Sequence, residues 1–241
     1  MTEKFGIEIE FLGLGNDEDA RYALPDFLFE ERCYGGYRCR MHHDGSVKSC
    51  SEHDNTEHCT DDCHDEDWIE HGAEIVTRPL KVCEESFDEV RMIFIALNEA
   101  GAWVNNSCGI HVHIDAEFVR SYPDKQAFFR LARAMYAKYE DAIDTRMDRH
   151  RQRGRNTYCQ SMKVERDEYV YNDRYFKLNT ASFVRHGTIE FRHHHGSLDA
   201  EEVIAWAKSC LVFIHYVRAV YEANYETPTA SLDEQIACLY A

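Results

Sequence analysis

The chain has 241 residues, 44% of them hydrophobic, which is enough for the core of one large domain or two small ones. Its formal net charge of −17 argues against a nonspecific surface for nucleic acid or anionic membranes. No signal-peptide pattern follows Met1 and no apolar run approaches the length of a membrane span, so we expect a cytoplasmic protein without a membrane partner. In that setting we expect the ten cysteines to be thiols or metal ligands.

The N-terminal third predicts two strands separated by turns and loops. Apolar residues alternate with polar ones in the first segment, as in a half-buried strand. A later stretch is polar, acidic and rich in Cys and His, which indicates a surface insertion. In chain order we expect a strand at 4–11, a turn at 13–19, no clear element at 20–43, a turn at Asp44-Gly45-Ser46, the insertion at about 49–71 and a strand at 72–79.

The rest of the chain predicts long helices between short strands. A capping box of Ser86 and Glu89 opens the first helix, and Gly101 ends it. We then expect a hairpin of 103–105 with 109–115, a helix from about Pro123 to about Asp148, a mobile arginine-rich loop at 146–155, strands at 175–180 and 187–193, a long helix opened by Asp199 and Glu202, and a short last helix opened by Ser231. The predicted core positions are Phe87, Val90, Phe94 and Leu97 in the first helix and Phe128, Leu131, Met135, Tyr139 and Ile143 in the second.

Strands separated by long helices and short hairpins are typical of the α+β class with a mainly antiparallel sheet. The sequence shows no internal repeat and no linker, so we expect a single domain over 1–241.

Three of the predicted strands share one unusual pattern. Each carries apolar residues on one face and charged or imidazole side chains on the other: Glu8 and Glu10; His111, His113 and Asp115; Glu190, Arg192 and His194. A solvated edge strand would explain one such pattern. Three of them favour a single polar sheet face on which ligands converge.

The residue types on these strands indicate the chemistry. Carboxylates with few histidines suit hard cations such as Mg²⁺ or Mn²⁺, whereas a catalytic zinc site would more often have two or three histidines. Arg192, two residues from Glu190, adds a planar donor fork that suits a phosphoryl group. The pattern therefore points to nucleotide-dependent phosphoryl transfer, without a Walker or Rossmann loop to hold the phosphates.

Five blocks, taken in order, resemble the amidoligase family of carboxylate–amine ligases, which is related to glutamine synthetase and glutamate–cysteine ligase. The blocks are Glu8-Ile9-Glu10, Asp44-Gly45-Ser46, Glu74-Ile75-Val76-Thr77-Arg78-Pro79, Cys108-Gly109-Ile110-His111-Val112-His113 and Thr188-Ile189-Glu190-Phe191-Arg192. The resemblance covers residues 5 to about 220. It implies a glutamine synthetase-like catalytic funnel, with ATP and Mg²⁺ (or Mn²⁺) on the sheet face, and amide formation through an acyl phosphate.

The resemblance also implies roles for particular residues. Those matched to metal ligands are Glu8, Glu10, Glu74, His111 and Glu190, and the catalytic group comprises Glu74, Glu190 and Arg192. Arg192 matches the phosphate-binding arginine, and His113 is expected to face the nucleotide. Lys177, two residues before Asn179, is expected on a neighbouring strand that faces the same funnel. Together with Arg192 and His113, it is expected to bind ATP.

The Cys/His-rich insertion is longer than the resemblance leads us to expect. Cys50, Cys59, Cys63 and His64 form a candidate structural Zn²⁺ site, and a flexible acidic loop with free thiols is the alternative. For Cys108 a packing role is favoured over a nucleophilic one. Of His193, His194 and His195, at most His194 is expected beside Arg192, because neighbouring strand residues point to opposite faces.

Two other function classes stay open. One is a metal-dependent hydrolase that uses the same Glu/His face, and the other is a non-catalytic zinc-binding interaction module. For a ligase, the sequence does not identify the acid or the amine, and we expect small-molecule or peptide substrates. Nucleic acid is not expected as a partner, but a modified nucleobase as the acceptor stays open. The oligomeric state is equally open.

Overall fold

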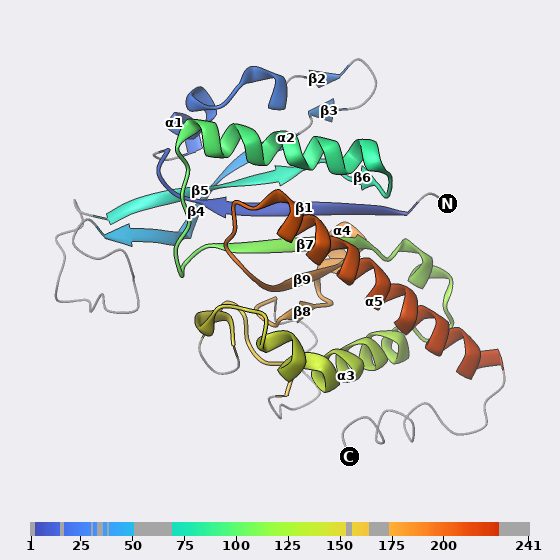
Figure 1. The fold of residues 1–241 in the computed structure, drawn as a ribbon. Coiled ribbons are helices and arrows are strands. Elements are labelled where there is room, and N and C mark those ends of the chain that lie inside the picture. Colours follow the sequence, from blue (N-terminus) through green and yellow to red (C-terminus); the bar gives the residue numbers. More distant parts are fainter. Residues whose placement is uncertain are drawn as a thin grey trace. The chain divides into compact units, whose positions relative to one another are not determined.

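The computed structural model describes residues 3–14, 17–29, 31–32, 36–37, 39–50, 69–152, 156–163 and 174–226. Its elements in chain order are β1 Lys4–Phe11, α1 Asp17–Ala23, η1 Asp26–Leu28, β2 Glu31–Arg32, β3 Gly36–Tyr37, β4 Cys39–Cys50, β5 Ile69–Thr77, β6 Leu80–Lys81, α2 Glu84–Ala100, β7 Gly109–Asp115, η4 Glu117–Ser121, α3 Lys125–Asp144, η5 Arg149–Arg151, β8 Leu178–Asn179, α4 Ser182–His186, β9 Thr188–His195 and α5 Ala200–Glu226. Figure 1 shows this mixture of helices with a mainly antiparallel open sheet.

The chain divides into two compact units, which we describe separately. The first comprises Met1–Val112 with His194–Trp206, and the second comprises His113–His193 with Ala207–Ala241. The strand order is β4-β5-β1-β7 in the first unit and β7-β9-β8 in the second. Strand β7 is named in both units because the division of the chain falls after Val112, within that strand, and a second division falls after His193, within β9. The single domain over 1–241 stays a prediction.

The first unit is built on β1, which forms as its alternating sequence predicts. The apolar side chains of Phe5, Ile7, Ile9 and Phe11 are all buried. Helix α2 covers this apolar face, and the ring of Phe87 stacks on that of Phe5 with centroids 5.4 Å apart. The opposite, polar face of β1 is thereby left for the carboxylates.

Helix α2 confirms the predicted core side but not the predicted start. Phe87, Val90, Phe94 and Leu97 are buried, and Gly101 ends the helix in the left-handed conformation at φ 86°. The helix begins earlier, at Glu84, with Cys83 as an N-cap that makes no side-chain hydrogen bond. The capping box is therefore wrong, and the Glu89 carboxylate instead accepts a 2.6 Å hydrogen bond from Arg78.

Three other expectations in this unit are wrong. Helix α1 lies within the stretch expected to be a turn and an irregular segment. The Asp44-Gly45-Ser46 turn lies inside β4, where the pairing with β5 shifts register between Asp44 and Lys48, so the turn residues mark a bulge. The hairpin does not form: Trp103 pairs with Leu12 through two backbone hydrogen bonds of 2.8 and 3.0 Å.

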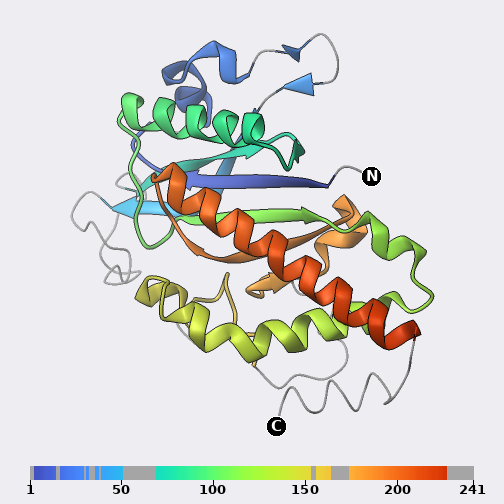
Figure 2. The same cartoon turned by 45° about the vertical axis from the view of Figure 1, so that its right-hand side comes forward.

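Helix α3 organises the second unit (Figure 2). Asp124 caps it by accepting a hydrogen bond from Ala127 N, and the predicted core residues Phe128, Leu131 and Met135 are buried. Tyr139 is exposed, so its predicted place in the core is wrong. After the helix, Arg151 lies in the 3₁₀ helix η5 and is only 2% exposed, so at this residue the expectation of a loop is wrong.

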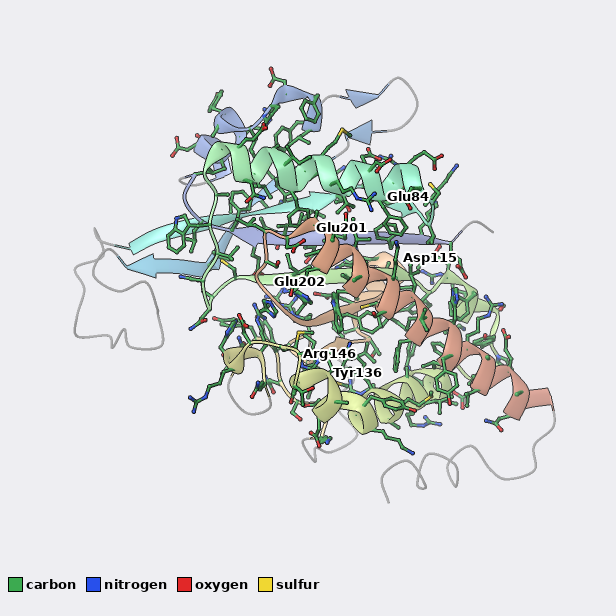
Figure 3. All side chains as sticks on the ribbon, viewed as in Figure 1. Glu84, Asp115, Tyr136, Arg146, Glu201 and Glu202 are labelled. Atoms are coloured by element: carbon green, nitrogen blue, oxygen red, sulfur yellow. The ribbon has the colours of Figure 1, made fainter. Side chains whose placement is uncertain are left out.

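A buried polar network joins α3 to the segment before β8. The Lys177 ammonium group is fully buried and forms ion pairs with Glu140, at 3.0 Å, and with Asp144. His193 Nε2 donates to the same Asp144 carboxylate at 2.6 Å, and its Nδ1 lies 2.9 Å from the hydroxyl of Tyr136. Figure 3 labels Tyr136 on α3. Each buried charge therefore has an opposite charge or a hydrogen bond within reach, as its burial requires.

Among the described residues, one helix is long and apolar enough to cross a membrane, judged by length and composition alone. It is Ala200–Asn224 of α5, with a mean hydropathy of 1.4 and 39% of the window buried. This corrects the expectation that no apolar run approaches that length. A single such helix is weak evidence, since the core helix of a soluble protein passes the same test. The cytoplasmic location therefore stays a prediction.

The buried network predicts a loss of stability in acid in two steps. In the first step, burial lowers the pKa of His193 below its ordinary 6.5. As the pH falls through about 6.5, this histidine binds a proton in the unfolded chain but not yet in the folded chain, so the folded state loses stability. Burial raises the pKa of Asp144, but hydrogen bonds from His193 and Lys177 outweigh it and lower that pKa from 3.8 to about 2, so the second step begins near pH 3.8.

Urea unfolding as a function of pH measures both steps. His193→Gln should reduce the slope of the free energy of unfolding against pH between about pH 6.5 and 5. The same change at the exposed His215 should leave this slope as in the wild type. An unchanged slope in His193→Gln would show that the imidazole is not buried in its neutral form.

Candidate metal centre

Glu8, Glu74 and His111 come together in the first unit. Their ligand atoms, two carboxylate oxygens and one imidazole nitrogen, all lie within 4.8 Å of one another. They come from β5, β1 and β7, which are neighbours in the sheet. Strand register produces the cluster: Glu10 lies opposite Glu74 in the β1–β5 pairing, which places Glu8 diagonally across from Glu74 on the same face.

His111 lies between the two carboxylates of β1. Its Nδ1 is 3.0 Å from Glu8 Oε2, and its Nε2 is 3.5 Å from Glu10 Oε1. The second Glu10 oxygen accepts a 2.6 Å hydrogen bond from the backbone of Gly109. Glu10 thus holds the imidazole and the start of β7 in place, while Glu8 belongs to the cluster with Glu74.

The electrostatics of the cluster favour a divalent cation. The side chains of His111 and Glu10 are only 3% and 4% exposed, and that of Glu8 is 21% exposed. Two unit negative charges about 5 Å apart repel each other by about 3 kcal/mol at an effective dielectric constant of 20. A cation such as Mg²⁺ or Mn²⁺ would convert this repulsion into attraction, and carboxylates with one imidazole are a donor set that both ions accept. The residues present therefore fit such an ion.

Two further side chains lie on the same face of the sheet, and no sequence pattern predicted either of them. Arg40 of β4 is in register with Val76, which is in register with Glu8. His42 is in register with Glu74. Both Arg40 and His42 are exposed. No period was visible around these residues, so only the pairing of β4 with β5 places them there.

The second unit holds Glu190 and Arg192 as a bonded pair. The Arg192 guanidinium donates to Glu190 at 2.5 Å and to the carbonyl of Tyr158 at 3.2 Å, and Asn179 donates to the other Glu190 oxygen at 2.6 Å. These bonds fix the planes of the carboxylate and the guanidinium. The phosphate-binding role of Arg192 stays a prediction.

His113 also lies in the second unit, within a group of hydroxyls. Its Nδ1 is 2.9 Å from Thr188 Oγ1 and 3.3 Å from Ser182 Oγ, and these two hydroxyls are 2.9 Å apart. These hydroxyl groups fix the orientation of the His113 ring and, being neutral, place no charge beside it. The expectation that His113 faces a nucleotide stays a prediction.

The other predicted residues have different surroundings. The Lys177 ammonium contacts the carboxylates of α3 in the buried network described above, and its ATP-binding role stays a prediction. Cys108 packs in a buried cluster with Leu12 and Val47, in accord with the packing role. Of the candidate zinc ligands, Cys50 lies in β4, but its side chain is outside the described residues, as are Cys59, Cys63 and His64.

Comparison with protein families identifies the class of this chain. The family profile described as "Putative amidoligase enzyme" matches residues 1–170 and 164–214. The chain therefore belongs to the amidoligase family, whose name designates a ligase. No curated protein and no solved structure gave a significant match.

The cluster predicts that Glu8, Glu74 and His111 hold one Mn²⁺ ion. Removing one carboxylate charge with Glu8→Gln should weaken Mn²⁺ binding at least about tenfold, which corresponds to about 1.4 kcal/mol. Glu99→Gln changes an exposed carboxylate at the end of α2 and should leave the affinity as in the wild type. Titration followed by Mn²⁺ electron paramagnetic resonance measures both, and equal affinities in the two variants would contradict the assignment.

Proposed function

We propose that this protein is an ATP- and Mg²⁺-dependent carboxylate–amine ligase that forms an amide bond through an acyl phosphate. Membership of the amidoligase family supports the ligase class, and the cluster of Glu8, Glu74 and His111 is the observation that supports a metal-assisted reaction. The proposed substrates are a small-molecule or peptide carboxylate and an amine.

The chemistry requires activation of the acid. A carboxylate is a poor acyl donor, because its oxygen is a poor leaving group. In the proposed reaction a carboxylate oxygen attacks the γ-phosphorus of ATP and ADP leaves; the amine nitrogen then attacks the acyl carbon, phosphate leaves with the C–O bond electrons, and the nitrogen loses a proton. Stabilisation of the charge on the transferred phosphoryl group is the main task of the protein.

In the first unit, Glu8, Glu74 and His111 would hold Mg²⁺, with Glu10 positioning the imidazole of His111. When bound, the cation would neutralise charge on the phosphate oxygens. Glu10 is fixed by the hydrogen bond from the Gly109 backbone and lies 3.5 Å from His111 Nε2, so it would help to orient the imidazole. The Glu10 side chain is therefore proposed to act through His111 as well as through its own charge.

In the second unit, Glu190 and Arg192 take the roles that the family resemblance implies. Glu190 would be a metal ligand, and Arg192 would donate to the transferred phosphoryl group. Its 2.5 Å bond to Glu190 and its bond to Tyr158 hold the guanidinium in one orientation. A glutamine synthetase-like funnel around these residues, with His113 and Lys177 near the nucleotide, completes the proposal by resemblance.

Release of ADP tests the proposal. The purified protein, incubated with ATP, Mg²⁺ and panels of carboxylates and amines, should release ADP and phosphate only when both an acid and an amine are present. ADP release that never depends on the panels, or no ATP binding at all, would contradict the ligase. Metal-dependent hydrolysis of an amide without nucleotide would instead support the hydrolase, and zinc binding without either activity the interaction module.

Two variants separate metal binding from turnover. Arg192→Ala should retain Mn²⁺ affinity in the first unit but lower turnover by at least about a hundredfold, because a donor to the transferred phosphoryl group is lost. Glu8→Gln should lower both. Arg185→Ala, a change of an exposed arginine in the same unit, is the matched control. Turnover of Arg192→Ala equal to that of this control would refute the phosphate role.

A further inference from the structure

A second group of metal-ligating side chains lies where β9 leads into α5. His194, His195 and Glu202 each offer one ligand atom, and the three atoms lie within 4.8 Å of one another. His195 Nε2 is 3.4 Å from Glu202 Oε1, and His194 Nε2 is 4.0 Å from the same oxygen. All three residues belong to the first unit, and none of them is in the cluster of Glu8, Glu74 and His111. Figure 3 shows Glu202 at the start of α5.

Strand alternation would place neighbouring residues on opposite faces, yet these two imidazoles lie together. Their rings stack with centroids 4.5 Å apart and an interplanar angle of 22°. His195 is the last residue of β9, where the alternation of the strand ends. The Nε2 atoms of both rings lie within 4.0 Å of Glu202 Oε1 in the first turn of α5. Because stacked rings direct their in-plane lone pairs nearly parallel, one ring must rotate for both to bind a single ion.

Hydrogen bonds orient two of the three ligands, His194 and Glu202, from the side away from the site. His194 Nδ1 donates to the carbonyl of His195 at 2.8 Å, so in the neutral ring Nε2 carries the lone pair. Ser197 Oγ donates to Glu202 Oε2 at 2.5 Å, which turns Oε1 toward the histidines. Such contacts behind the ligands are typical of metal sites, where they set the tautomer and the direction of the donor atoms.

The backbone between the ligands is also held. Gly196 N donates to the carbonyl of Cys108 at 2.9 Å, and a Cβ atom at position 196 would lie only 2.6 Å from the Cβ of Cys108. Only glycine fits this approach. The turn that brings Glu202 back toward the histidines is thus preorganised, which reduces the entropy that a ligand must overcome.

The donor set selects the metal. A tetrahedral zinc site with bonds of about 2.0 to 2.1 Å needs neighbouring ligand atoms about 3.3 Å apart, so the 3.4 Å separation fits and the 4.0 Å separation requires a shift of about 0.7 Å. Two imidazoles with one carboxylate suit Zn²⁺ or a similar first-row transition ion, whereas Mg²⁺ prefers oxygen ligands. Glu202 is 41% exposed and His194 only 3%, so the site opens to solvent on the carboxylate side.

We propose that His194, His195 and Glu202 form a zinc-type site separate from the Mg²⁺ site, with a fourth position open to water or an exogenous ligand. The ion links the end of β9 to the first turn of α5. The proposal does not depend on the ligase activity, and it uses none of the cysteines of the acidic insertion.

Co²⁺ binding to the tag-free protein, stripped of metal by a chelator, tests the site. Four-coordinate Co²⁺ absorbs strongly in the visible range, whereas six-coordinate Co²⁺ absorbs weakly, and thiolate ligands add an intense near-ultraviolet band. We expect one equivalent with a four-coordinate spectrum and no thiolate band, displaced by Zn²⁺. Glu202→Gln and His195→Ala should each lower the Co²⁺ affinity at least about a hundredfold. Ser197→Ala should lower it about 10- to 100-fold.

Matched controls separate this site from the others. Glu201→Gln changes the neighbouring carboxylate, which Arg91 holds at 2.6 Å, and should leave the Co²⁺ spectrum unchanged. Glu8→Gln and a Cys59→Ser/Cys63→Ser variant should also keep it. Circular dichroism confirms folding, and the partly exposed Glu202 makes Glu202→Gln informative even if His195→Ala unfolds. Absence of a four-coordinate spectrum in the wild type, or its loss in the cysteine variant but not in Glu202→Gln, would overturn the proposal.

Discussion

The contact of one imidazole with two carboxylates is the constraint on which the first unit depends. His111 lies 3.0 Å from Glu8 and 3.5 Å from Glu10, and Glu74 brings a third carboxylate to the same face. Each ring nitrogen of His111 faces one carboxylate, but a neutral imidazole carries no charge that could offset the negative charges of these carboxylates. A bound cation would stabilise such an arrangement, and separately the family membership indicates a ligase.

The second unit meets the same demand by a different route. There the buried ammonium of Lys177 forms ion pairs with both Glu140 and Asp144, and His193 donates one hydrogen bond to Asp144, so each of these groups has a partner of this chain. A fully partnered buried network holds its elements in register. In the second unit one ammonium and one imidazole hydrogen bond offset two carboxylates, whereas in the first unit the ligand atoms of Glu8, Glu74 and His111 lie close enough together to share a cation.

The polar residues differ in how far local pattern could place them. Alternation alone assigned Glu8, Glu10 and His111 to polar faces, because a period of two is a local property of a strand. It could not assign Lys177, whose partners lie on α3, more than thirty residues earlier in the sequence. It also failed at His194 and His195, since the end of β9 and the glycine after it override the alternation there. Cys50, Cys59, Cys63 and His64 remain a prediction from composition.

The sequence by itself determined the strand at 4–11, the core face of α2 with its glycine stop, and the family, since each of these depends on residue order within short segments. Only the tertiary structure decided which polar groups meet. Register brings Glu74 beside Glu8 and adds Arg40 and His42 to their face, and the turn after β9 returns Glu202 to two histidines. Register and turn geometry depend on pairing between distant segments, and no local period encodes that pairing.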